Sequence, residues 1–192
     1  MNNPKYISIL ALFISINLQS QTIGDEGIQE YWRLMDKMEQ SEEVSDNDLY
    51  WLWTKPGYKS YAEYGTEPSV FFPIYKEVYD PKYKTSYSSE EINSLNYSAF
   101  VWNRLNKAKL NRKELENYVT YLKSPEVIQR AKNKALKYLP DEVKDKGDDF
   151  RVELILADGG GRVYYPNKVA IIDAFTIYQE GEDIIAHEVH HL

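Results

Sequence analysis

Three residues near the end of the chain have the types and the spacing of a metal-binding site. His187 and His191 are four positions apart, and Glu188 directly follows the first histidine. On an α-helix, positions i and i+4 lie on the same face one turn apart, so two imidazoles placed there can converge on one metal ion. This His-Glu-x-x-His pattern predicts that His187 and His191 bind Zn²⁺.

Glu188 has a different predicted role. On the same helix it is rotated by about 100° from His187, which keeps it near the metal without making it a ligand. A carboxylate in that place can act as a general base on a water molecule that zinc activates, while zinc polarises the carbonyl under attack. Glu188 is therefore the candidate catalytic residue.

The surroundings of the pattern favour a buried helix. Glu182 and Asp183 stand in the first turn, where negative charge suits the helix dipole, and most of the other positions are apolar. All 3 histidines of the chain lie between residues 182 and 192. This clustering counts against a chance occurrence of a short motif.

Other polar residues near the pattern have more than one possible role. His190 is an alternative ligand or a substrate contact, although such a residue is more often a neighbour that hydrogen-bonds or is exposed. Asp173 and Asp183 could orient a ligating imidazole through a hydrogen bond, or simply end a strand and begin a helix. The glycines at 159–161 indicate a turn, because they lack the spacing and the lysine of a phosphate-binding loop.

Through His187, Glu188 and His191 the sequence resembles the zincin metallopeptidases. Its doubled histidine, HEVHH, is similar to that of zinc-dependent peptidases exported by Gram-negative bacteria. The resemblance covers about the last fifty residues and does not extend securely to the N-terminal half. It implies a peptide or protein substrate, bound in extended form along a strand at the edge of the sheet, which would be Val169–Phe175 or Arg162–Tyr165.

A catalytic zinc site needs three protein ligands and an open position. The resemblance places the third ligand after the motif, as a glutamate or a histidine, whereas the sequence ends at Leu192. We therefore expect a C-terminally truncated site, and a 192-residue chain that binds zinc weakly and hydrolyses no peptide.

The rest of the chain predicts an α+β fold. Apolar spacing and capping signals predict helices over Asp25–Gln40 and Asn111–Leu122, one that begins at Ser88 and runs toward Lys107, and one that begins at Ser124-Pro125. Residues 58–87 read as loops around a short helix. Alternating or apolar runs predict three strands: Phe150–Leu156, Arg162–Tyr165 and Val169–Phe175. The fold class is thus a helical N-terminal half, a small β-sheet and a C-terminal metal-binding helix.

Residues 1–20 have the order of a secretory signal peptide: one lysine, an apolar run over Tyr6–Leu18 and small polar residues around Ser20. The run is too short to span a hydrocarbon core of about 30 Å as a helix, so no membrane span is expected in the mature chain. We expect a secreted or periplasmic protein with a mostly helical region over 21–148 and a strand-turn-strand with the motif helix over 149–192.

Composition excludes several classes of function. The net charge of −7 argues against binding to nucleic acid, which needs a basic surface, and the absence of cysteine excludes disulfides and thiolate metal sites. The 17 tyrosines, dense between residues 50 and 87, leave an alternative open: a non-catalytic secreted domain that binds glycan or protein through a Tyr/Trp-rich surface.

Overall fold

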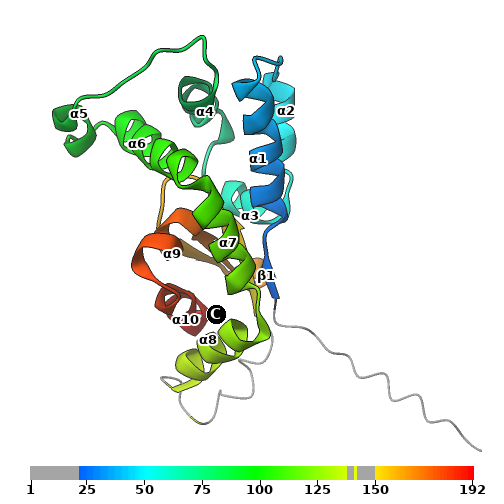
Figure 1. Ribbon diagram of the computed structural model, residues 1–192. Helices are drawn as coiled ribbons and strands as arrows, with labels where there is room; N and C mark the ends of the chain where they lie inside the picture. Colours follow the sequence, from blue (N-terminus) through cyan, green and yellow to red (C-terminus); the bar gives the residue numbers. More distant parts are fainter. Residues whose placement is uncertain (1–21, 138–140, 142–149) are drawn as a thin grey trace, which may run out of the picture.

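The computed structural model describes residues 22–137, 141 and 150–192, and these form an α+β fold (Figure 1). The predicted fold class is confirmed, with a helical N-terminal half and a small sheet. The predicted signal peptide, residues 1–20, lies outside the described residues, as does all of the charged stretch at 141–149 except Asp141. Within the described residues no helix is both long and apolar enough to cross a membrane.

The helices account for most of the described chain. The α-helices are α1 (Glu26–Glu39), α2 (Asp46–Leu52), α3 (Pro56–Glu63), α4 (Phe72–Tyr79), α5 (Ser89–Asn93), α6 (Tyr97–Leu110), α7 (Arg112–Leu122), α8 (Pro125–Lys137), α9 (Ala174–Glu180) and α10 (Asp183–His190). Two short 3-10 helices are η1 (Pro68–Val70) and η3 (Tyr165–Asn167).

The sheet contains four strands in the described residues: β1 (Thr22–Gly24), β2 (Arg151–Ile155), β3 (Gly161–Tyr164) and β4 (Val169–Asp173). Their order is β1-β2-β4-β3, so β1 and β3 form the two edges. Strands β1, β2 and β4 are parallel to one another, and β3 runs antiparallel to β4. Of the two strands that the sequence offers for binding an extended peptide, only β3 lies at an edge.

Register separates the sheet into two faces that carry different helices. Because side chains alternate along a strand, Glu153 and Arg162, both of which pair with Ile171, lie on one face, whereas Gly161, which pairs with Ile172, lies on the other. Helix α3 packs against β2 and β4, and α10 packs against β3 and β4. The face with Glu153 therefore lies under α3, and the face with Gly161 lies under α10.

Several predicted elements are confirmed with small changes in their bounds. Helix α1 buries Ile28, Tyr31, Trp32, Met35 and Met38, the residues that carry its apolar spacing. The capping box at the start of α5 is present, since the Ser88 side chain accepts from the Glu91 backbone and the Glu91 carboxylate accepts from the Ser88 backbone. Helices α7 and α8 begin where the sequence places them.

Three predictions are wrong about where helices or strands begin and end. Residues 58–87 are more helical than expected, because Pro56 begins α3 and α4 follows at Phe72. The helix that starts after Ser88 stops at Asn93, and a new one begins where the Asn96 side chain caps α6. The last strand ends at Asp173, whose side chain accepts from the Thr176 backbone and so starts α9.

The tyrosine-rich segment mostly fills the core. Among the largest fully buried side chains are Tyr58, Tyr61, Tyr75 and Tyr79, and their rings pack edge-to-face or stacked with neighbouring aromatic rings. This packing agrees with the structural interpretation of the tyrosines and leaves only part of the run, including Tyr50 and Tyr64, on the surface.

Candidate functional site

His187 and Glu188 lie on α10, and His191 is the residue at its C-cap. Gly181 adopts a φ of +95° between α9 and α10, a conformation that glycine reaches without steric cost. Ile185, Ala186 and Val189 then bury the apolar side of α10. The start of α10 is thus determined by the glycine before it, and its position by an apolar face that packs onto the sheet.

A tyrosine of α7 and two basic residues of α8 contact the start of α10. The Arg130 guanidinium donates to both carboxylate oxygens of Glu182, at 2.8 and 3.0 Å, and the Tyr121 hydroxyl donates to the same carboxylate. Lys134 forms an ion pair with Asp183. The hydrogen bond from Arg130 lowers the pKa of Glu182 below its ordinary value, so this carboxylate stays charged at the positive end of the helix dipole.

His187 and His191 point their imidazoles toward each other. Their Nε2 atoms lie 3.4 Å apart, and the ring planes are inclined by 83°. Two nitrogens bound to one tetrahedral Zn²⁺ at about 2.0–2.1 Å lie about 3.4 Å from each other. Both rings are exposed on their outer side. The two imidazoles are therefore spaced to share one zinc ion and leave its remaining positions accessible.

Glu188 lies beside these histidines in a different environment. Its exposed fraction is 8%, and its side chain lies against the backbone of Gly161 in β3. Within the described part of the chain, its carboxylate has no hydrogen-bonding or ion-pairing partner. A buried carboxylate of this kind is available to accept a proton from a molecule in the adjoining groove.

The groove beside Glu188 follows β3. Its volume is about 380 Å³, and its lining comes from both faces of the edge strand. The lining residues are Tyr64, Gly161, Arg162, Val163, Tyr164, Tyr165, Pro166, Glu188 and His191. Because β3 pairs only with β4 in the described sheet, its outer backbone groups face this groove.

The remaining residues that the sequence singles out lie apart from this groove. His190 and His187 line a second cavity, of about 510 Å³, together with Lys134 and other residues of α8 and α10. Asp183 forms an ion pair with Lys134, and no hydrogen bond joins it to an imidazole among the described residues. Asp173 forms an ion pair with Arg104 of α6 at 2.9 Å and caps α9. Its role is therefore structural.

A third ligand is not found near the two imidazoles in residues 22–137, 141 and 150–192. No group of three or more histidine, aspartate or glutamate side chains is arranged to hold a metal ion within these ranges. The residues described thus supply two nitrogen ligands and a carboxylate beside them.

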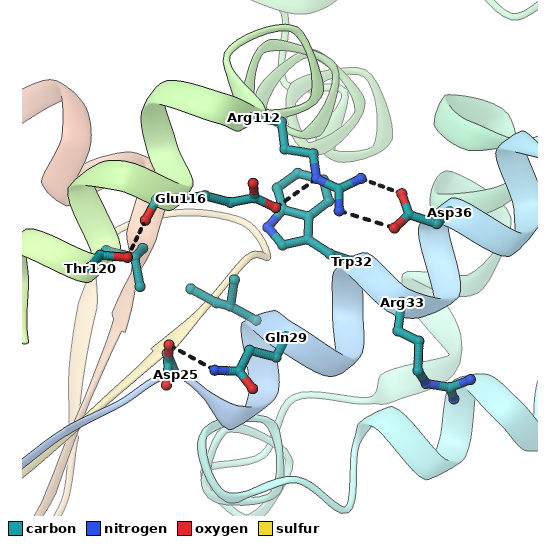
Figure 2. Close-up of a pocket in the computed structure, with 10 residues that line it drawn as sticks. Asp25, Gln29, Trp32, Arg33, Asp36, Arg112, Glu116 and Thr120 are labelled. Carbon is teal, nitrogen blue, oxygen red and sulfur yellow. Dashed lines mark hydrogen bonds and ion pairs between the residues drawn. The ribbon is translucent and has the colours of Figure 1, made fainter.

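A further cavity, of about 420 Å³, lies between α1 and α7 (Figure 2). Arg112 crosses it, donating to Asp36 and Glu116 while its guanidinium lies 4.6 Å from the Trp32 ring centre. These charges pair with one another, and the cavity adjoins neither α10 nor β3. We infer that the ion pair between Arg112 and Asp36 in this cavity holds α1 and α7 together.

Sequence reasoning missed two residues near the site. The pattern of three glycines places Gly161 in the turn, although a glycine at the start of a strand is a signal of close approach by another group. Arg104 had no signal in the sequence, because its partners, Asp173 and Thr176, lie about seventy residues further along the chain.

Comparison with known proteins gives one match. Searches of curated proteins and of solved structures found none. Residues 49–192, three quarters of the chain, match the family described as "Putative zinc dependent peptidase (DUF5700)". This range contains α10, β3 and the groove between them, and the chain therefore belongs to that family.

Proposed function

We propose that this protein is an exported zinc peptidase of the HExxH type, in which His187 and His191 bind zinc and Glu188 is the general base. The observation that carries the proposal is the 3.4 Å separation of the two Nε2 atoms beside a buried carboxylate that opens onto a groove. Family membership supports peptide hydrolysis in general and peptide or protein substrates.

The roles of the residues follow from their places. His187 and His191 would hold the metal with neutral imidazole nitrogens, and a bound zinc ion would polarise the scissile carbonyl and acidify water. Glu188 accepts the proton of the attacking water at its carboxylate and then delivers it to the nitrogen of the departing amine. Burial of Glu188 between α10 and β3 limits the number of positions that its carboxylate can take.

The substrate is a peptide in extended form, aligned with β3. An extended peptide can pair with the outer backbone groups of an edge strand, while pockets beside the strand receive its alternate side chains. This arrangement is supported by the groove, which is lined by Glu188 and His191 on one face of β3 and by Tyr64 near the other. Export of the protein rests on residues 1–20 alone.

The decisive experiment separates metal binding from proton transfer. Zinc content and peptide hydrolysis are measured for the protein expressed from its complete gene, and for the variants Glu188→Gln, His187→Ala and Glu153→Gln. We expect Glu188→Gln to keep its zinc and to lose about 10²–10⁴ in turnover, because only the base is removed. His187→Ala should lose both zinc and turnover.

Glu153→Gln is the matched control, because Glu153 is also a buried glutamate next to a glycine but lies on the other face of the sheet. It should retain both properties. Unchanged turnover in Glu188→Gln, or unchanged zinc in His187→Ala, would contradict the assignment.

A further inference from the structure

Three consecutive glycines join β2 to β3, and they do not have the same reason to be glycine. Gly159 and Gly160 adopt φ values of +92° and +77°, in the left-handed region that side chains disfavour. Gly161 has no positive φ and is the first residue of β3. Its backbone conformation is open to any residue, so the missing side chain needs another explanation.

The explanation lies on α10. A Cβ atom added to Gly161 would lie 2.5 Å from Cδ and Oε1 of Glu188 and 2.6 Å from its Cγ. These distances are shorter than van der Waals contact allows. The space that a side chain would occupy at this position is therefore filled by the end of the Glu188 side chain.

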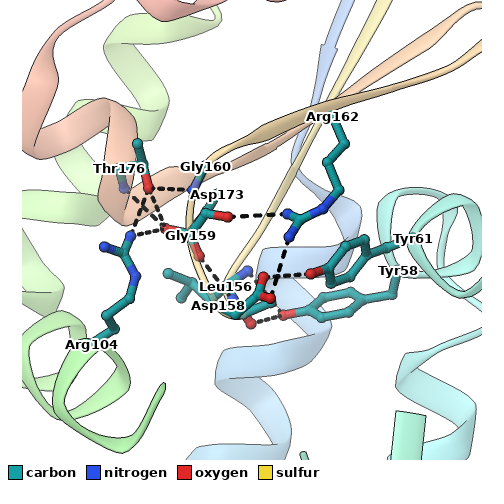
Figure 3. A network of polar contacts seen from close by, with 11 residues as sticks. Tyr58, Tyr61, Arg104, Leu156, Asp158, Gly159, Gly160, Arg162, Asp173 and Thr176 are labelled. Atoms are coloured by element: carbon teal, nitrogen blue, oxygen red, sulfur yellow. Dashed lines mark hydrogen bonds and ion pairs between the residues drawn. The ribbon is translucent and has the colours of Figure 1, made fainter. Parts of the chain in front are cut away.

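Hydrogen bonds hold the backbone of Gly160, the residue directly before Gly161 (Figure 3). Asp173 donates its backbone N–H to the Gly160 carbonyl at 3.0 Å, and Gly160 donates its own N–H to the Thr176 hydroxyl at 3.0 Å. Arg104 donates to Asp173 and to the same hydroxyl, at 2.9 and 2.6 Å. Since this network and the pairing with β4 fix the strand, a side chain at 161 would displace the flexible end of Glu188 and leave the backbone in place.

We propose that Gly161 is a positioning residue: its lack of a side chain creates the space that sets the place of the Glu188 carboxylate beside the groove. The inference rests on the proposed function, in which Glu188 is the base. Displacing a base by about 1 Å can cost about 10²-fold in rate, because proton transfer needs hydrogen-bond distance to the attacking water.

The test compares Gly161→Ala with Gly24→Ala. A Cβ at Gly24 would lie 2.5–2.7 Å from the carboxyl atoms of Glu153, so this control introduces a similar clash at the opposite edge of the sheet. We expect Gly161→Ala to lower kcat by about 10²-fold with little change in KM, because the outer backbone groups of β3 are unaltered. Gly24→Ala should leave kcat unchanged.

A second readout does not depend on turnover. The carboxyl carbon resonance of Glu188, assigned by its loss in Glu188→Gln, is followed by NMR in glutamate-labelled protein. It should move in Gly161→Ala and stay in place in Gly24→Ala. In a Glu188→Asp background, the side chain is one methylene shorter, so Gly161→Ala should lower kcat by a smaller factor.

The outcomes separate the two proposals. An unmoved Glu188 resonance, or an unchanged kcat in Gly161→Ala while Glu188→Gln is inactive, overturns the role of Gly161 and leaves the proposed function standing. If the wild-type protein expressed from its complete gene hydrolyses no peptide, the proposed function is overturned, and the resonance then still decides whether Gly161 sets the position of Glu188.

Discussion

The two edges of the sheet use the same local arrangement in different ways. At the β1 edge, Gly24 lies beside the carboxylate of Glu153, and at the β3 edge, Gly161 lies beside that of Glu188. Both glutamates are buried, with exposed fractions of 1% and 8%, and they lie on opposite faces of the sheet. In each case a glycine makes room for a carboxylate that would otherwise collide with the edge strand.

The difference lies in what each carboxylate meets. Glu153 lines a pocket too, but it forms an ion pair there with Arg151, whereas Glu188 has no ion-pair partner in the described residues and lines the groove that also contains His191. Burial raises the pKa of Glu153, against the opposing effect of Arg151. A buried carboxylate that is paired with a cation contributes to the fold. An unpaired one that faces a groove beside two converging imidazoles can act as an acid or base.

The largest expected effect on stability comes from Asp173, which lies on β4 next to the edge strand β3. Asp173→Ala removes the acceptor of hydrogen bonds from Arg104, Ala157 and Thr176, and it leaves the Arg104 guanidinium partly buried without its carboxylate. We expect the free energy of unfolding to fall by about 3–5 kcal/mol, measured by urea denaturation. Glu153→Gln should cost far less, because burial already disfavours the charge of Glu153. Equal losses of stability in the two variants would contradict this expectation.

A pH titration of stability sharpens the comparison at β1. Because the pKa of Glu153 is raised above 4.5, the folded protein binds more protons than the unfolded chain between the two pKa values. This group therefore makes the free energy of unfolding fall as pH rises through that window. Glu153→Gln lacks this fall, so its stability should gain on that of the wild type as pH rises above 4.5. A difference that is constant with pH would contradict the raised pKa.

The smallest expected effect concerns how α10 is anchored. Arg130→Gln removes the bidentate contact with Glu182, which lies on the surface, so Tm should fall by about 2 °C or less at neutral pH. The pKa of Glu182 is lowered in the folded protein, so its contribution is present above the unfolded pKa and is lost as pH falls. The deficit of the variant should therefore disappear in acid; calorimetry at two pH values measures it, and a deficit that grows in acid would refute this origin.

Much of the helical structure could be predicted from local signals. The apolar spacing of α1, the capping box at Ser88 and the Ser124-Pro125 start of α8 all act within one or two helical turns. The apolar run over residues 169–175 predicts a strand that is too long, because Asp173 caps α9 within that run, and the ion pair of Asp173 with Arg104 from α6 has no signal in the sequence. Local patterns carry no information on partners that are distant in the chain.

The same distinction between local and long-range contacts applies to the candidate site. The sequence by itself determined the i, i+4 placement of His187 and His191 and the neighbouring place of Glu188, because a helix sets these positions through its own 3.6-residue period. Only the tertiary structure decided that β3 is an edge strand, that Gly161 lies under Glu188 and that Glu153 is buried under α3. Each of these depends on strand order and packing between segments up to about a hundred residues apart, which no local spacing specifies.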